Sequence, residues 1–295
     1  MRFFKLVLLC FFIVVPLMAS GAEKAKTIDE LAKMYDSSRC KGCHAEIYAQ
    51  WEKSHHARPL MGVKDGLMLI PVVKGSAFAP KDPKQATMKN FPCFKCHLPQ
   101  ALTSAEDSVA AELTQALLDA DKGKVSKLQI TCVVCHSDKA ILHRLTLGAP
   151  EKDVIYSTRD IASHPDGTFT KVKKSVVMNQ AVYCGQCHGT GPNFDAENPY
   201  QCATLYGNYL HTYIPQGGTQ TCQECHMKKI NGKADHLIAP NWNDRPQASE
   251  LLGKAVSLDV QTVGYQFLYK AGDYRPMVVV NTRINHNAGH EIPNG

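Results

Sequence analysis

One five-residue pattern recurs along the chain and limits what it can fold into. Two cysteines three positions apart are followed at once by a histidine, C-x-x-C-H, in five separate places. With 12 Cys and 13 His in 295 residues, chance would produce roughly 0.02 such matches. The repeat therefore serves a specific chemistry. Its copies are Cys40–His44, Cys93–His97, Cys132–His136, Cys184–His188 and Cys222–His226.

Covalent haem attachment needs two thiols and an imidazole at this spacing. In c-type haem sites both cysteines bond the porphyrin, and the adjacent histidine binds the iron. Cysteine pairs can also hold zinc or form a redox disulfide, but zinc sites do not place a histidine after every pair. The repeat predicts five covalent haems, attached by Cys40, Cys43, Cys93, Cys96, Cys132, Cys135, Cys184, Cys187, Cys222 and Cys225, with His44, His97, His136, His188 and His226 as proximal ligands.

Five porphyrins would replace many of the side chains that normally fill a protein interior. The content of 44% hydrophobic and 20% charged residues is that of a globular, soluble protein. The predicted fold class is therefore mainly α with long loops around a haem-packed core, followed by a short β-rich C-terminal segment.

Two helices are predicted from their capping and apolar spacing. Thr27 and Glu30 form a capping box that opens a helix ending near Met34. A second helix is predicted over 105–121, with a capping box of Thr103 and Glu106 and with Gly123 beyond its end. After the first C-x-x-C-H copy, Ile47, Tyr48 and Trp51 share one helical face, which we expect to pack against a haem.

The first 22 residues have the three regions of a secretory signal peptide. Arg2 and Lys5 precede an apolar run from Leu6 to Met18, and Ala19–Ala22 offers a cleavage site. The run is shorter than the ~20 residues that span a bilayer, although a retained anchor is the alternative. We expect cleavage after Ala22 and an exported protein, periplasmic or on the outer cell surface.

The remaining chain divides into a haem-binding part, 23–254, and a β-rich part, 255–295. In the second part Val256, Leu258 and Val260 alternate with polar residues, and a further apolar run covers Met277–Val280. The strand-like sequence runs close to Gly295, so we expect either a natural terminus there or a continuation in a longer protein. The net charge of +6 is spread without a basic cluster, which argues against nucleic acid as a partner.

Eight histidines lie outside the repeats and could supply the second axial ligand of each iron. Each could instead serve at the surface or in hydrogen bonds, and Met61 or Met68 could also ligate an iron. We take His56, His164, His211, His236 and His290 as the candidate distal ligands. Cys202, the one cysteine outside the repeats after the apolar leader, is expected to be buried or to pair with another chain.

The first repeat continues in a way that resembles a known group of proteins. Tyr48, Trp51, Ser54 and His56 follow Cys40–His44 in the pattern C-x-x-C-H…Y-x-x-W-x-x-S-x-H. This pattern resembles multihaem cytochromes c that group with hydroxylamine oxidoreductase and the tetrahaem cytochrome c of nitrifiers. The resemblance implies closely spaced haems and a His56 that binds the iron of a haem other than that of Cys40–His44.

The resemblance implies a carrier of electrons in an anaerobic-type respiratory pathway. Some relatives reduce nitrogen or sulfur oxyanions at an open iron, but this sequence has no C-x-x-C-K site. A reductase and a subunit of a cytochrome filament are the alternatives. Expected partners are quinol-linked membrane cytochromes, periplasmic cytochromes, an outer-membrane porin complex or a metal oxide acceptor.

Overall fold

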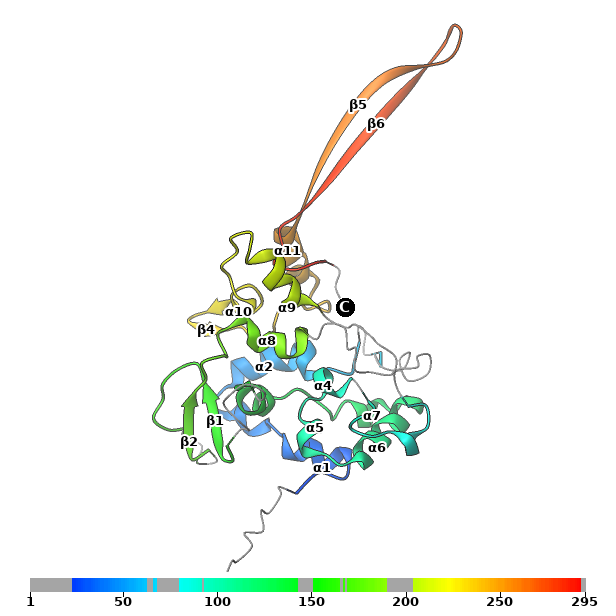
Figure 1. The fold of residues 1–295 in the computed structure, drawn as a ribbon. Helices are drawn as coiled ribbons and strands as arrows, with labels where there is room; N and C mark the ends of the chain where they lie inside the picture. Colours follow the sequence, from blue (N-terminus) through cyan, green and yellow to red (C-terminus); the bar gives the residue numbers. More distant parts are fainter. Residues whose placement is uncertain are drawn as a thin grey trace, which may run out of the picture.

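The structure, a computed structural model, has a helical body from which one long β-hairpin projects (Figure 1). It describes residues 23–62, 66–67, 80–91, 93–142, 151–164, 167, 169–189 and 204–292. The predicted signal peptide, Met68, His143 and Cys202 lie outside these ranges. Within them, no helix combines the length and the apolar character that crossing a bilayer requires.

The predicted first helix is confirmed as α1, Ile28–Met34. The Thr27 side chain accepts a hydrogen bond from the backbone N–H of Glu30 (3.1 Å), as expected of the N-cap. The Glu30 carboxylate, however, accepts from the backbone N–H of Lys26 (2.7 Å) rather than from that of Thr27. Glu112 instead accepts from the N–H of Ile28 (2.8 Å), which ties α1 to a distant helix.

The second predicted helix is shorter than expected, and its predicted capping box is wrong. The helix α6 spans Asp107–Leu118, and the Thr103 hydroxyl donates to the carbonyl of Gln100 instead of capping it. Ala105 is extended because it pairs with Ala25 in an isolated parallel bridge. Gly123 does not end the helix either, since Ala120 takes up the left-handed conformation and Gly123 lies inside α7, Lys122–Val125.

The main core lies between these helices at the end of the body opposite the hairpin (Figure 1). α6 buries Val109, Leu113 and Leu117 on one stripe, which is the spacing of an amphipathic helix. Phe91 and Phe94 stack with ring centroids 4.6 Å apart. The short helices α4, Phe94–His97, and α5, Ala101–Ser104, complete this core, so a conventional apolar interior supports the second C-x-x-C-H copy.

Further short elements lead from the core to the later repeats. The strands β1, Val154–Ser157, and β2, Lys171–Lys174, pair in parallel at one side of the body. Remaining helical segments of the first half are η1 Ser38–Gly42, α2 Ala45–Lys53, η2 His55–Ala57, η4 Pro83–Gln85 and the π-helix η5 Val134–Asp138.

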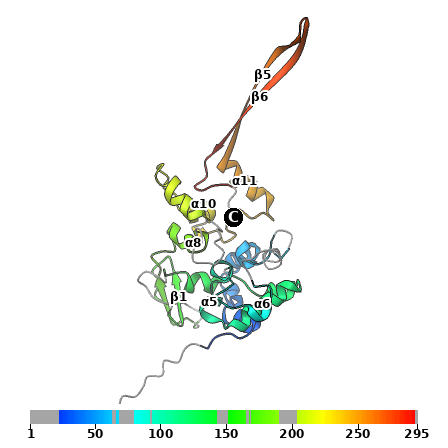
Figure 2. The ribbon, with the colours of Figure 1, turned by 45° about the vertical axis from the view of Figure 1, so that its right-hand side comes forward.

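The second half of the chain stacks on this body and ends in the hairpin (Figure 2). It comprises α8 Ala181–His188, α9 Leu205–Asn208, the π-helix η6 Tyr209–Tyr213, α10 Cys222–His226, the short strands β3 Lys229–Ile230 and β4 Lys233–Ala234, and α11 Arg245–Ala255. The hairpin strands are β5, Val256–Lys270, and β6, Asp273–His286. The alternating stretch that begins at Val256 lies in β5.

Candidate haem centres

All five C-x-x-C-H copies lie on short helical segments or directly at their ends. The first lies on η1 and ends at the residue before α2, the second on α4, the third on η5, the fourth on α8 and the fifth on α10. In a helix, residues three and four apart share a face. Each copy therefore turns its two thiols and its imidazole toward the same side.

The fifth copy shows how local sequence sets such a helix. The Thr221 hydroxyl accepts from the N–H of Glu224 (3.3 Å), while the Glu224 carboxylate accepts from the N–H of Thr221 (2.7 Å). This reciprocal capping box satisfies two helix-end donors, and it starts α10 at Cys222. Both cysteines and the histidine then fall within one turn and a half.

The histidine rings are held in the tautomer that suits a metal ligand. Nδ1 of His97 lies 2.6 Å from the carbonyl oxygen of Pro59, and Nδ1 of His136 lies 2.8 Å from that of Tyr156. His226 makes the same contact with Ala239. A carbonyl only accepts, so Nδ1 must carry the proton, and the lone pair is left on Nε2. Orientation of this kind is typical of metal-ligating histidines, so these residues fit an iron centre.

Three pairs of histidine rings lie at almost the same spacing, one pair tilted, one edge-on and one nearly parallel. The ring centroids are 6.3 Å apart for His44 and His164, 6.1 Å for His56 and His188, and 5.9 Å for His226 and His290. Two imidazoles that bind one metal from opposite sides, each through a bond of about 2 Å, would have ring centres about 6 Å apart. Each pair joins a repeat histidine to a histidine from another part of the chain.

The other candidate distal ligands differ from these three. His236 is half-buried, and its Nδ1 contacts the carbonyl of Ala234 (2.8 Å), which leaves Nε2 available. Burial lowers the pKa of His136, and nearby His236 and His44 lower it further, so His236 lies in the neighbourhood of His136. His211 is exposed on η6, and among the described residues it has no histidine ring opposite it. Met61 lies in the apolar core.

His56 has an environment that suits a ligand rather than a surface residue. Burial, reinforced by His188, lowers its pKa to about 4, so the ring is neutral near pH 7, which is the form that binds metals. His56 and the preceding residue, His55, are both partly exposed, and His55 Nε2 and His56 Nδ1 are both enclosed without a hydrogen-bond partner in the described structure. Trp51 anchors the helix before them, because its indole N–H donates to the carbonyl of Ile130 (2.9 Å).

Cysteines of different repeats lie close to one another. Cys40 is near enough to Cys132 to lower the pKa of that thiol, and Cys96 is near enough to Cys187 to raise the pKa of that one. Cys184 and Cys222 make the third such pair. These contacts join the first repeat to the third, the second to the fourth, and the fourth to the fifth.

Tyr183 supplies the remaining connection, between the third repeat and the fourth. Its hydroxyl donates to the backbone carbonyl of Cys135 (2.8 Å), and it directly precedes Cys184. The Gln223 amide on α10 also donates to the carbonyls of Met178 and Gln180, just before α8. α8 is therefore the junction where the second, third and fifth repeats meet.

Phe169 and Arg39 hold the His164 ring in place, and no sequence pattern singled out either residue. Phe169 is buried and meets the His164 ring edge-on, with centroids 5.7 Å apart. The Arg39 guanidinium carbon lies 4.7 Å from the centre of the same Phe169 ring. Arg39 immediately precedes Cys40, so this stack ties His164 to the first repeat. No motif marks Phe169 in the sequence.

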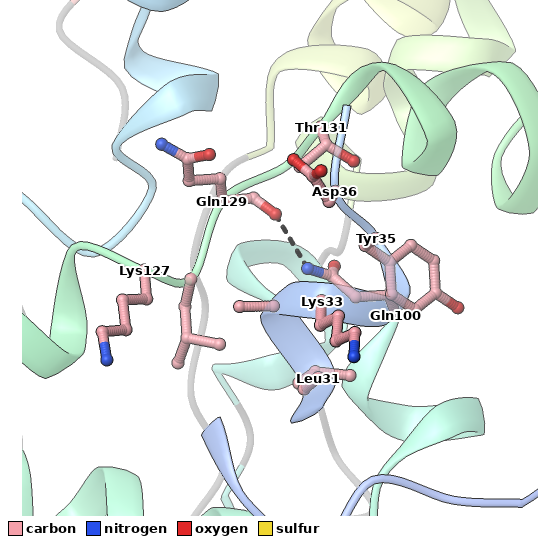
Figure 3. A pocket seen from close by; sticks show the side chains of 10 residues that line it. Leu31, Lys33, Tyr35, Asp36, Gln100, Lys127, Gln129 and Thr131 are labelled. Atoms are coloured by element: carbon pink, nitrogen blue, oxygen red, sulfur yellow. Dashed lines mark hydrogen bonds between the residues drawn. The ribbon is translucent and has the colours of Figure 1, made fainter. Parts of the chain in front are cut away.

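A cavity of about 340 Å³ opens beside α1 (Figure 3). Of the described residues that line it, Thr131 directly precedes Cys132, and none is itself a repeat cysteine or histidine. The buried Gln100 side chain crosses its wall and donates to the carbonyl of Gln129 (2.8 Å). Gln100 Oε1 and Thr131 Oγ1 are buried there without a hydrogen-bond partner in the described structure. Among described residues, no three His, Cys, Asp or Glu side chains are grouped so that they could hold a bare metal ion.

Comparison with known proteins gives one match. Residues 39–137, which contain the first three repeats, match the family described as cytochrome c554 and c-prime. Searches of curated proteins and of solved structures found no significant match. The family match supports a multihaem c-type cytochrome that carries electrons on covalently attached haem iron.

Proposed function

We propose that the chain is an exported pentahaem c-type cytochrome that passes single electrons along five closely spaced haems. The observation that carries this proposal is the set of contacts between repeats. Cys40 with Cys132, Cys96 with Cys187, and Cys184 with Cys222 connect neighbouring sites, and Tyr183 connects the two halves. Each cysteine would carry the edge of its own haem, so neighbouring haem edges would lie close together.

The three histidine pairs are proposed to hold haem iron, one iron for each pair. His164 would complete the site of His44, His56 that of His188, and His290 that of His226. His236 is proposed as the partner of His136. Haem iron bound in this way supplies reversible one-electron chemistry between the ferric and ferrous states. Backbone carbonyls orient His97, His136, His226 and His236 through their Nδ1 atoms. Burial lowers the pKa of His56, His136, His188, His226 and His236, which favours the neutral form that binds metals.

The contacts suggest an order of transfer. A path from the first repeat through the third and fourth to the fifth runs along the molecule from η1 to α10, and the second repeat joins it at α8. Electrons would enter and leave at opposite ends of this path. The proposed exchange partners are membrane quinol-linked or periplasmic cytochromes, an outer-membrane porin complex or a metal oxide outside the cell.

Haem content and iron spin state test the proposal. We expect the exported protein to carry five covalent haems, seen by intact mass and by haem staining after denaturing electrophoresis. Electron paramagnetic resonance of the oxidised protein should show low-spin ferric iron only, which for the haem of His97 requires a ligand beyond the four pairs named above, and carbon monoxide should bind slowly or not at all after reduction. A mass with four haems or fewer would contradict the proposal. A stoichiometric high-spin haem with turnover of nitrite, hydroxylamine or a sulfur oxyanion would favour a reductase.

Phe169 gives a separate prediction. Replacing Phe169 with alanine should free the His164 ring, so that one haem becomes partly high-spin while all covalent links remain. Phe169→Tyr keeps the ring and serves as the control, with an unchanged low-spin spectrum. If Phe169→Ala retains a fully low-spin spectrum, His164 is either held by other contacts or not a ligand.

A further inference from the structure

The β5–β6 hairpin stands away from the rest of the molecule in both views (Figures 1 and 2). It is joined to the body through α11, and in the described part of the chain no third strand pairs with either of its edges. The ladder is continuous from Val256 opposite His286 to Leu268 opposite Tyr274. A two-stranded hairpin alone is marginally stable in water, so one this long needs something to pack against.

One face of the hairpin is mainly apolar, with Thr262, Gln266, Thr282 and His286 as its polar members, and we name it the apolar face. It consists of every second residue from Val256 to Leu268 together with their cross-strand partners from Tyr274 to His286. This set contains no Asp, Glu, Lys or Arg. Its largest aliphatic side chains are 50% to 69% exposed: Leu258, Val260, Leu268, Val278, Val280 and Ile284.

The opposite face is polar in the half nearest the body. Asp259 lies opposite Arg283, and the Asn285 amide donates to the Asp259 carboxylate (2.8 Å). Charged and amide groups of this kind favour contact with water. In the outer half this face is apolar as well, with exposed Val263, Tyr265 and Phe267 on β5 and Met277 and Val279 on β6. Only near the body do the two faces differ in the way that an antiparallel sheet with one covered and one solvated face does.

Gly264 gives an independent sign that something approaches closely. It lies in the middle of β5, its partner is Val278, and its φ is not in the left-handed region. A Cβ added there would meet nothing within 4 Å, so neither a turn nor packing within the chain requires glycine. Glycine inside a strand weakens it, and often marks a place where another backbone comes near. Gly264 belongs to the apolar face.

We propose that the apolar face is covered by the same face of a second copy of this chain, with the two hairpins stacked face to face. Such a contact is isologous and closes as a two-fold dimer. The absence of formal charge on the face means that no like charges repel. Lipid is a poorer occupant, because the open edges of the hairpin would leave backbone groups unpaired in hydrocarbon.

The area is sufficient for a modest dimer. Thirteen residues of two-stranded sheet cover a flat footprint of about 40 Å by 10 Å. Because the side chains make each face uneven, two such faces together bury on the order of 1,000 Å² of accessible surface. This total is near the lower limit of specific protein interfaces. The small Thr262 and Gly264 at the middle of the face would let the two sheets approach where larger residues flank them.

Sedimentation of the haem-loaded protein over a wide range of concentration tests the proposal. The wild type should dimerise reversibly. Val260→Lys places a charge on the apolar face and should raise the dimer Kd about tenfold or more. Gln261→Lys, its neighbour on the polar face, is the matched control and should dimerise like the wild type.

The Gly264→Val variant distinguishes an effect on the close approach of the two hairpins from an effect on the stability of one hairpin. Valine favours strands, so the hairpin should show equal or slower amide hydrogen exchange in the monomer, while dimerisation weakens about tenfold or more. A wild type that stays monomeric at every concentration overturns the proposal, and flotation of that monomer with phosphatidylcholine vesicles would identify lipid as the occupant. Equal effects of Val260→Lys and Gln261→Lys would also overturn it.

Discussion

Replacing His56 with methionine should raise the midpoint potential of one haem, the one held by His188, and leave all five covalent links in place. The His56 and His188 rings face each other at 6.1 Å, and we propose that both bind that iron. A thioether ligand stabilises the ferrous state relative to imidazole, so the expected rise is on the order of 100 mV. Spectroelectrochemical titration would resolve it as one shifted wave.

His55→Met is the matched control, because it changes the adjacent residue in the same short helix η2. The His55 ring has no repeat histidine facing it at this spacing among the described residues, so its replacement should leave every wave in place. A shift with His55→Met and none with His56→Met would show that the ligand assignment is displaced by one residue. Unchanged waves in both variants would remove His56 from the set of ligands.

Replacing Gly185 with valine should destabilise the fourth repeat. A Cβ on Gly185 would lie 2.5 Å from Cγ and 2.6 Å from Cδ1 of Tyr206. These atoms are at the root of the ring, so α9 itself would have to move away from α8. Overpacking of this kind costs about 1 to 3 kcal/mol, and it falls at the junction of the repeats. Thermal unfolding followed by circular dichroism should show a midpoint several degrees lower.

Gly42→Val is the control for this change. Gly42 also lies between the two cysteines of a repeat, but a Cβ there meets nothing within 4 Å. Its φ is not in the left-handed region, so valine introduces no backbone strain of that kind. We expect its midpoint to stay within about 1 °C of the wild type, since open surface positions usually change stability little. Equal losses in both variants would show that any side chain between these cysteines is harmful.

Local patterns in the sequence predicted what depends on neighbouring residues, and failed where distant segments compete. Thr27 caps α1 as predicted, because the cap needs only the next three residues. The start of α6 was misplaced because Ala25, eighty residues away in the chain, holds Ala105 extended. Gly123 was misread as a helix end because Ala120 adopts the left-handed conformation despite its Cβ cost.

The sequence by itself predicts where haem is attached, because each C-x-x-C-H copy holds its own thiols and imidazole within five consecutive residues. Only the tertiary structure decided which histidine faces which, since His44 and His164, or His226 and His290, are far apart along the chain and no local rule pairs them. The same is true of the contacts that bring four repeats together at α8. Composition shows that the chain has enough histidines for five irons, and the packing of α8, Phe169 and η2 decides which histidine rings lie close together.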